Sequence, residues 1–122
     1  MDWKYFRRES FACKHCGENR IEDAFVSSLD ALRGRVGFPL VVTSGYRCPT
    51  HNAAVSSTGP TGPHTTGRAV DLAVSHDKAY WVLKEALSMG FTGIGVRGHG
   101  DSRFVHLDAI TGDGRPRVWS YP

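Results

Sequence analysis

Two histidines and an aspartate are the residues whose types and spacing could do chemistry in this chain. His64 and Asp71 lie in PHTTGRAVDLAV (residues 63 to 74), and His106 lies in RFVHLDAI (residues 103 to 110). Imidazole nitrogens and carboxylate oxygens are zinc ligands, and a catalytic zinc site uses three of them and leaves one position open. A histidine followed by an aspartate is by itself more often a surface pair, so a metal site here depends on His106 reaching the same place.

The segments that carry Asp71 and His106 both read as strands. Alternation puts Asp71 between two alanines on one face of a strand at 69 to 74, and small neighbours leave room above that face. In the second segment Phe104, His106 and Asp108 share one face. If the two strands are neighbours in a sheet, Asp71 and His106 can converge on one ion.

The other elements predict the scaffold. Apolar residues at spacings of three and four predict an amphipathic helix from Ile21 to about Arg35. The further expected elements are strands at 40–46 and 92–96, a short helix from Pro49, a surface loop at 56–63, a helix at 78–89, and a turn with an extended tail at the end. We therefore predict an α+β fold, with a mixed, mainly antiparallel sheet and helices packed on one side, in a single domain of residues 1–122.

Composition narrows the classes of partner. Fifteen basic and twelve acidic residues give a net charge of +3, and the basic residues are scattered. This charge is too weak to indicate nucleic acid, although it suits an anionic polymer such as a cell-wall glycan. No apolar run is long enough for a membrane span, and the start lacks the order of a signal peptide. We expect a soluble protein, which would need another route to a cell wall.

Three cysteines leave their role open. An odd number argues against a full disulfide framework. Cys13 and Cys16 form a Cys-x-x-Cys pair, but a zinc ribbon needs a second pair and only Cys48 remains. Reduced, packed thiols are favoured over a disulfide to Cys48, and a structural zinc is the least favoured alternative.

Four stretches together resemble a known family. SGYRCPTHNAAV, GPHTTGRAVDLAV, GFTGIGV and FVHLDA resemble, in this order and at these intervals, the zinc D-alanyl-D-alanine carboxypeptidases and murein endopeptidases. That family shares its fold with hedgehog signalling domains. The resemblance covers about Phe6 to Trp119, and the opening YFRRESFACKHCG resembles phage and prophage members. The family pattern His-x-x-Gly-x-Ala-x-Asp with a distant strand histidine implies that His64, Asp71 and His106 bind Zn²⁺.

The resemblance implies further roles and shows two departures. Arg47 matches an arginine that reaches polar groups of the substrate, and His51 and Asn52 are expected to brace the site. Gly62 stands where many relatives have serine, and Arg103 stands where several branches have the catalytic carboxylate. An arginine cannot accept a proton from the zinc water.

A general base must then come from elsewhere. Asp101 is favoured, because a loop carboxylate can lie on the open side of the metal. Asp108 is the second candidate, unless it supports His106 or pairs with Arg115, and His99 is the third.

The resemblance implies a zinc metallopeptidase, acting as a monomer, that hydrolyses peptidoglycan stem or cross-bridge peptides. It would be a D,D-carboxypeptidase or an endopeptidase of endolysin type, acting at the cell wall. The alternative is a non-catalytic, zinc-stabilised cell-wall-binding or phage structural domain, which Arg103 favours. The sequence does not select the peptide bond.

Overall fold

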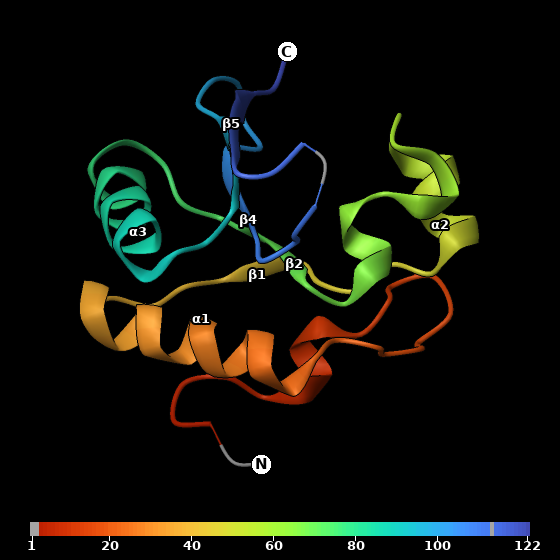
Figure 1. Ribbon diagram of the computed structural model, residues 1–122, viewed down its shortest axis with the longest axis horizontal. Coiled ribbons are helices and arrows are strands. Elements are labelled where there is room, and N and C mark those ends of the chain that lie inside the picture. The colour runs from red at the N-terminus through yellow and green to blue at the C-terminus, as the bar shows by residue number, and fades with distance from the viewer. Residues whose placement is uncertain (1–2, 113) are drawn as a thin grey trace.

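The computed structural model describes residues 3–112 and 114–122. Within them the chain forms an α+β structure around one five-stranded sheet (Figure 1). The strands are β1 (Val42–Ser44), β2 (Ala69–Leu72), β3 (Gly93–Arg97), β4 (Phe104–Asp108) and β5 (Arg117–Ser120). The α-helices are α1 (Asp23–Val36), α2 (Pro49–Val55) and α3 (His76–Met89), and the 3₁₀ turns are η1 (Arg8–Phe11), η2 (Gly59–Thr61) and η3 (Pro63–Thr66).

The sheet is mixed and mainly antiparallel, as the sequence predicts. Its strand order is β1-β2-β4-β3-β5, and only the β3–β5 pair is parallel. Strands β2 and β4 are neighbours, and their register puts Asp71 directly opposite His106. The condition for these two residues to converge is therefore met.

The two faces of the sheet have different roles. Alternation along β2 and β4 sends one set of side chains into the apolar core, where they pack with residues of α1 and α3. Figure 1 shows α1 and α3 next to each other, while α2 and the turns η2 and η3 lie apart from them. Both long helices thus cover one face, as expected, and Asp71 and His106 are on the other. The core includes Phe25, Val26, Leu29, Leu32, Val70, Leu72, Val82, Ile94, Val105 and Leu107.

Helix α1 begins later than the apolar spacing predicts. The helix starts at Asp23, and Ile21 packs into the core from the segment before it. The Glu22 N–H donates to the carbonyl of Gly67, which fixes the chain entry outside the helix. The helix ends at Val36, and the next residue, Gly37, has a φ of 77°, the left-handed conformation that glycine adopts most easily.

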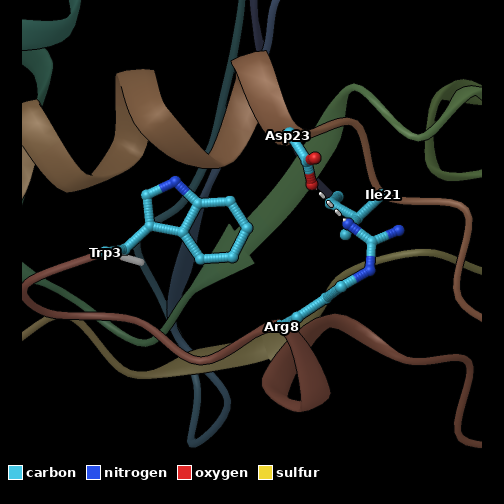
Figure 2. Close-up of a pocket in the computed structure, with 4 residues that line it drawn as sticks. All are labelled: Trp3, Arg8, Ile21 and Asp23. Carbon is cyan, nitrogen blue, oxygen red and sulfur yellow. Dashed lines mark hydrogen bonds and ion pairs between the residues drawn. The ribbon is translucent and has the colours of Figure 1, made fainter. Parts of the chain in front are cut away.

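The segment before α1 folds back along this helix. Trp3 donates from Nε1 to Ser27 Oγ at 3.0 Å, and Arg8 forms an ion pair of 2.7 Å with Asp23. Trp3, Arg8, Asp23 and Ile21 line a cavity of about 310 Å³, and Figure 2 shows these four side chains. No predicted site residue lines this cavity, so the segment belongs to the scaffold.

The end of the chain differs most from the expected structure. Residues 117–120 form the edge strand β5, whereas the sequence predicts an extended tail. Hydrogen bonds hold the backbone of β5 to β3 at both ends of the strand: Arg117 N–H donates to Thr92 O, and Tyr121 N–H donates to Val96 O. Within the described residues, no helix combines the length and apolar character that crossing a bilayer requires.

Candidate metal centre

A single row of residues crosses the sheet at the candidate site. Ser44, Asp71, His106, Gly95 and Trp119 are successive partners on β1, β2, β4, β3 and β5. They lie on the face away from α1 and α3. The sheet therefore holds the central carboxylate and imidazole at fixed positions.

His64 reaches the same point from outside the sheet. It lies on η3, which ends at Gly67 with a φ of 77°. Its Nε2 lies 3.2 Å from Asp71 Oδ1, and His106 Nδ1 lies 3.1 Å from the same oxygen. The exposed fractions of His64, Asp71 and His106 are only 5%, 7% and 1%. The structure thus brings the three predicted ligands together, and zinc binding by them stays a prediction.

Hydrogen bonds on the far side of each imidazole fix its tautomer. His64 Nδ1 lies 2.8 Å from the carbonyl oxygen of Gly45, and His106 Nε2 lies 2.8 Å from Asp108 Oδ2. Both partners can only accept, so these nitrogens carry the protons. The other nitrogen of each ring presents a lone pair toward Asp71.

This donor set fits a zinc ion. Two lone pairs and a carboxylate oxygen facing one another repel unless a cation lies among them. Zinc bonds of about 2.0–2.2 Å meeting at a tetrahedral angle put neighbouring ligand atoms about 3.3 Å apart. The two distances to Asp71 Oδ1, 3.1 and 3.2 Å, are close to that value. The second hydrogen bond on each imidazole is also the arrangement found around metal-binding histidines.

The pKa shifts of Asp71 and His106 also indicate that the site favours a positive charge. Burial raises the pKa of Asp71, but hydrogen bonds with His106 and His64 outweigh burial and hold this pKa below its usual range. Burial lowers the pKa of His106, but the Asp108 and Asp71 carboxylates outweigh it and raise this pKa. The pocket therefore favours a cation, either a proton or a metal ion.

Asp108 is buried and contacts the His106 ring, so it is not exposed to the cavity. Arg115 donates to both of its oxygens, from Nε at 3.0 Å and from Nη2 at 2.9 Å. Gly93, opposite Asp108 on β3, leaves room for the carboxylate, since a Cβ there would lie 2.1 Å from Oδ1. Burial raises the pKa of Asp108, but hydrogen bonds from His106 and Arg115 lower it to about 2. Asp108 is thus a buried anion that orients His106.

Arg47 is held beside the free oxygen of Asp71. Its Nε donates to Ser44 Oγ at 3.0 Å, its Nη1 donates to Asn52 Oδ1 at 3.1 Å, and its Nη2 lies 3.6 Å from Asp71 Oδ2. Asn52 therefore braces the arginine, as the resemblance implies. His51 lies elsewhere, with its ring stacked on His15 at 5.4 Å between centroids.

A cavity of about 690 Å³ opens onto the three predicted ligands. Trp119 and Tyr121 form part of its wall, and the Trp119 ring lies 5.1 Å from the His106 ring. Sequence reasoning missed both aromatic residues, although their spacing of two is what one face of an edge strand produces. The basic residues of the lining are Arg47, Arg97, Arg115 and Arg117.

Asp101 and His99, two of the three general-base candidates, are not brought to this cavity. Asp101 lines a different cavity of about 580 Å³, with His76 and Arg103 among its neighbours. His99 is exposed and is not part of the lining of either cavity. A catalytic role for Asp101 stays a prediction.

The two departures from the family pattern have local explanations. Arg103 donates to the carbonyl of Gly100 and contacts His76, away from the three ligands. Gly62 packs directly against Thr58, and a Cβ at position 62 would lie 2.0 Å from Thr58 Oγ1. The glycine lets the turn that carries His64 pack closely against the segment after α2.

Comparison with known protein families identifies the family of the chain. No curated protein matches the chain. The family model described as Peptidase M15 matches residues 4–108, a range that contains His64, Asp71 and His106 and most of the sheet that positions them. The chain therefore belongs to the Peptidase M15 family, that of the zinc D-alanyl-D-alanine carboxypeptidases.

Proposed function

We propose that this protein is a zinc-dependent peptidase that hydrolyses peptidoglycan stem or cross-bridge peptides. The observation that carries the proposal is the convergence of two histidine lone pairs on Asp71 Oδ1 at the wall of a large cavity. In this proposal one domain, residues 1–122, supplies all three ligands, so the protein acts as a monomer at the cell wall.

The chain's own residues would prepare the site for hydrolysis. His64, Asp71 and His106 hold the metal, and Gly45 and Asp108 keep the two imidazoles in the ligating tautomer. When bound, zinc polarises the scissile carbonyl and lowers the pKa of a water molecule to about 7. Arg47 directs a guanidinium into the cavity, where it can pair with a carboxylate or a developing oxyanion of the substrate.

The charge of the cavity supports an anionic peptide as substrate. Four arginines line it, and among the described lining residues Asp71 is the one acidic side chain. Peptidoglycan peptides carry free carboxylates, which such a cavity would attract.

Purified peptidoglycan provides the direct test. We expect the zinc-loaded protein to release new amino groups, a chelator to stop the release, and added Zn²⁺ to restore it. His64→Ala should lose the activity, while Lys84→Ala, on the exposed surface of α3, should keep it. Mass spectrometry of the released muropeptides would show which bond is cut, and so distinguish a D,D-carboxypeptidase from an endopeptidase.

A second candidate is a non-catalytic, zinc-stabilised module that binds the cell wall. The observation that favours it is the absence of a carboxylate other than Asp71 among the described residues of the cavity. This candidate predicts full zinc occupancy and sedimentation with peptidoglycan, but no new amino groups. That result would overturn the peptidase proposal, whereas zinc-dependent release would exclude the binding module.

A further inference from the structure

A second cluster of metal-binding side chains lies outside the site described above. Cys13 and Cys16 belong to the segment between η1 and α1, and Cys48 directly precedes α2. All three thiols are free, and their sulfur atoms lie within 4.8 Å of one another. A Cys-x-x-Cys pair alone offers a metal ion two sulfur ligands, and Cys48, from a segment far away in the sequence, adds a third.

His15 offers a fourth ligand to the same cluster. Its Nδ1 lies 3.6 Å from Cys48 Sγ. A zinc–sulfur bond of about 2.3 Å and a zinc–nitrogen bond of about 2.0–2.1 Å at a tetrahedral angle put the two ligand atoms about 3.5 Å apart. The distance to Cys48 is therefore the one expected across a zinc ion. The ligand atoms within 4.8 Å of one another are the three sulfurs, and a small shift of the exposed His15 ring toward Cys13 and Cys16 would complete the set. Three cysteines and one histidine form a standard set of ligands for structural zinc.

Backbone hydrogen bonds stabilise the ligating form of these sulfurs. The Cys48 N–H donates to Cys13 Sγ at 3.3 Å, and the His51 N–H donates to Cys48 Sγ at 3.4 Å. Donors of this kind also stabilise a thiolate, which is the form of cysteine that binds zinc.

The local turn presents both sulfurs of the pair to one point. The Gly17 N–H donates to the carbonyl of Cys13 at 2.8 Å, and Gly17 has a φ of 77°. The Cys13 N–H donates to Glu18 O, also at 2.8 Å, which closes the loop on its other side. The His51 ring stacks on His15 and limits its rotation. The loop and the start of α2 therefore form a preorganised site.

We propose that Cys13, Cys16, Cys48 and His15 bind a structural Zn²⁺ ion, separate from the ion at His64, Asp71 and His106. Counting cysteines alone predicts against this site, because a zinc ribbon needs four and the chain has three. The fourth ligand is the histidine inside the Cys-x-x-Cys pair, in CKHC. Four protein ligands leave no open position, so this ion would stabilise the fold and take no part in hydrolysis.

The site joins the N-terminal segment to the part of the chain that supports the other centre. Cys48 follows Arg47 directly, and the Tyr46 N–H donates to the carbonyl of Phe11 at 2.8 Å. Gly45, whose carbonyl fixes the His64 tautomer, packs against the backbone of Phe11. An ion between residues 13–16 and Cys48 would therefore hold this whole connection in place.

Zinc content per chain tests the proposal in the full-length protein purified under reducing conditions. We expect elemental analysis to find two Zn²⁺ per chain in the wild type and one in His64→Ala. Cys16→Ser should also lose one, and its mutated side chain is exposed, so the fold should persist. His99→Ala, which removes another exposed loop histidine, should keep both ions, whereas His15→Ala should weaken zinc retention against a chelator at least tenfold. If only the cysteine site exists, one ion remains in His64→Ala and none in Cys16→Ser.

Cobalt substitution gives a spectroscopic test of the same site. Co²⁺ bound by three thiolates should show intense sulfur-to-cobalt charge transfer and the visible bands of a tetrahedral ion, and Cys16→Ser should weaken both. A wild type without these bands, whose zinc is lost entirely in His64→Ala, would overturn the proposal. A disulfide detected by intact mass in protein kept under reducing conditions, or three thiols that react freely in the presence of excess Zn²⁺, would overturn it as well.

Discussion

His106 and Asp108 are two residues apart on β4 and share one face, so the His106 Nε2 donates to Asp108 Oδ2 at 2.8 Å. This bond keeps the proton on Nε2 and orients the ring so that the unprotonated Nδ1 faces Asp71. Asp108→Asn removes the charge that holds this orientation, and we expect zinc affinity at the site to fall by about 10–100-fold. Competition with a chromophoric chelator would measure it. Asp101→Asn serves as the matched control, and an equal loss in both variants would contradict the assignment.

The Arg115–Asp108 pair predicts a cost in stability. Both side chains are largely buried, and the guanidinium makes two bonds to the carboxylate. Arg115→Gln leaves a buried carboxylate without its cation, so we expect the free energy of unfolding to fall by about 3 kcal/mol in urea titrations. Arg117→Gln, an exposed neighbour, should change it by less than about 0.5 kcal/mol. Combining Arg115→Gln with Asp108→Asn should recover part of the loss.

The lowered pKa of Asp108 predicts how the free energy of unfolding changes at acid pH. Its pKa falls from 3.8 to about 2 on folding, because hydrogen bonds from His106 and Arg115 outweigh the effect of burial. A lowered carboxyl pKa stabilises the fold above pH 4, and this stability is lost as pH falls from about 4 to 2. With a chelator present, the wild type should lose about 2 kcal/mol more than Asp108→Asn between pH 5 and pH 2. Parallel profiles of the two proteins would exclude this linkage.

Gly95 predicts a change in substrate binding without a change in metal binding. A Cβ at this position would lie 2.5 Å from Trp119 Nε1 and 2.7 Å from Tyr121 Cε2. Gly95→Ala should displace this wall of the cavity and raise KM several-fold while zinc content stays constant. Gly98→Ala is the control, since the nearest atom to its Cβ would be 4.0 Å away. Loss of zinc in Gly95→Ala alone would show that Trp119 supports His106 instead.

Asp101 tests whether a loop carboxylate takes part in the reaction. A general base contributes about 10²–10⁴-fold to the rate, so Asp101→Asn would lose that factor if this residue accepted the proton. Asp101 lines another cavity in this structure, so a rate kept within about threefold would exclude it as the base. A fall of 10²-fold with unchanged zinc content would instead mean that the loop moves over the site during catalysis.

The fold and the three ligands could be predicted from local patterns. The alternation around Asp71 and His106 gives their shared face, and the family pattern adds His64. The sequence offers Arg115 as a partner of Asp108 but leaves that role open beside catalysis, because no spacing rule tells whether two side chains seven residues apart across a turn make contact. Strand β5 was missed for a similar reason: its pairing with β3 is parallel and non-local, and its own residues do not alternate in polarity.

The wall of the cavity at the three predicted ligands comes from two parts of the chain. The family match ends at Asp108, after all three predicted ligands, whereas Arg115, Trp119 and Tyr121 follow it. Under the proposed function, changes after residue 116 would thus alter one wall of the cavity and leave the three predicted ligands unchanged. Grafting a different tail after residue 116, with Arg115 retained, would offer a way to redirect the protein to other peptides without rebuilding its centre.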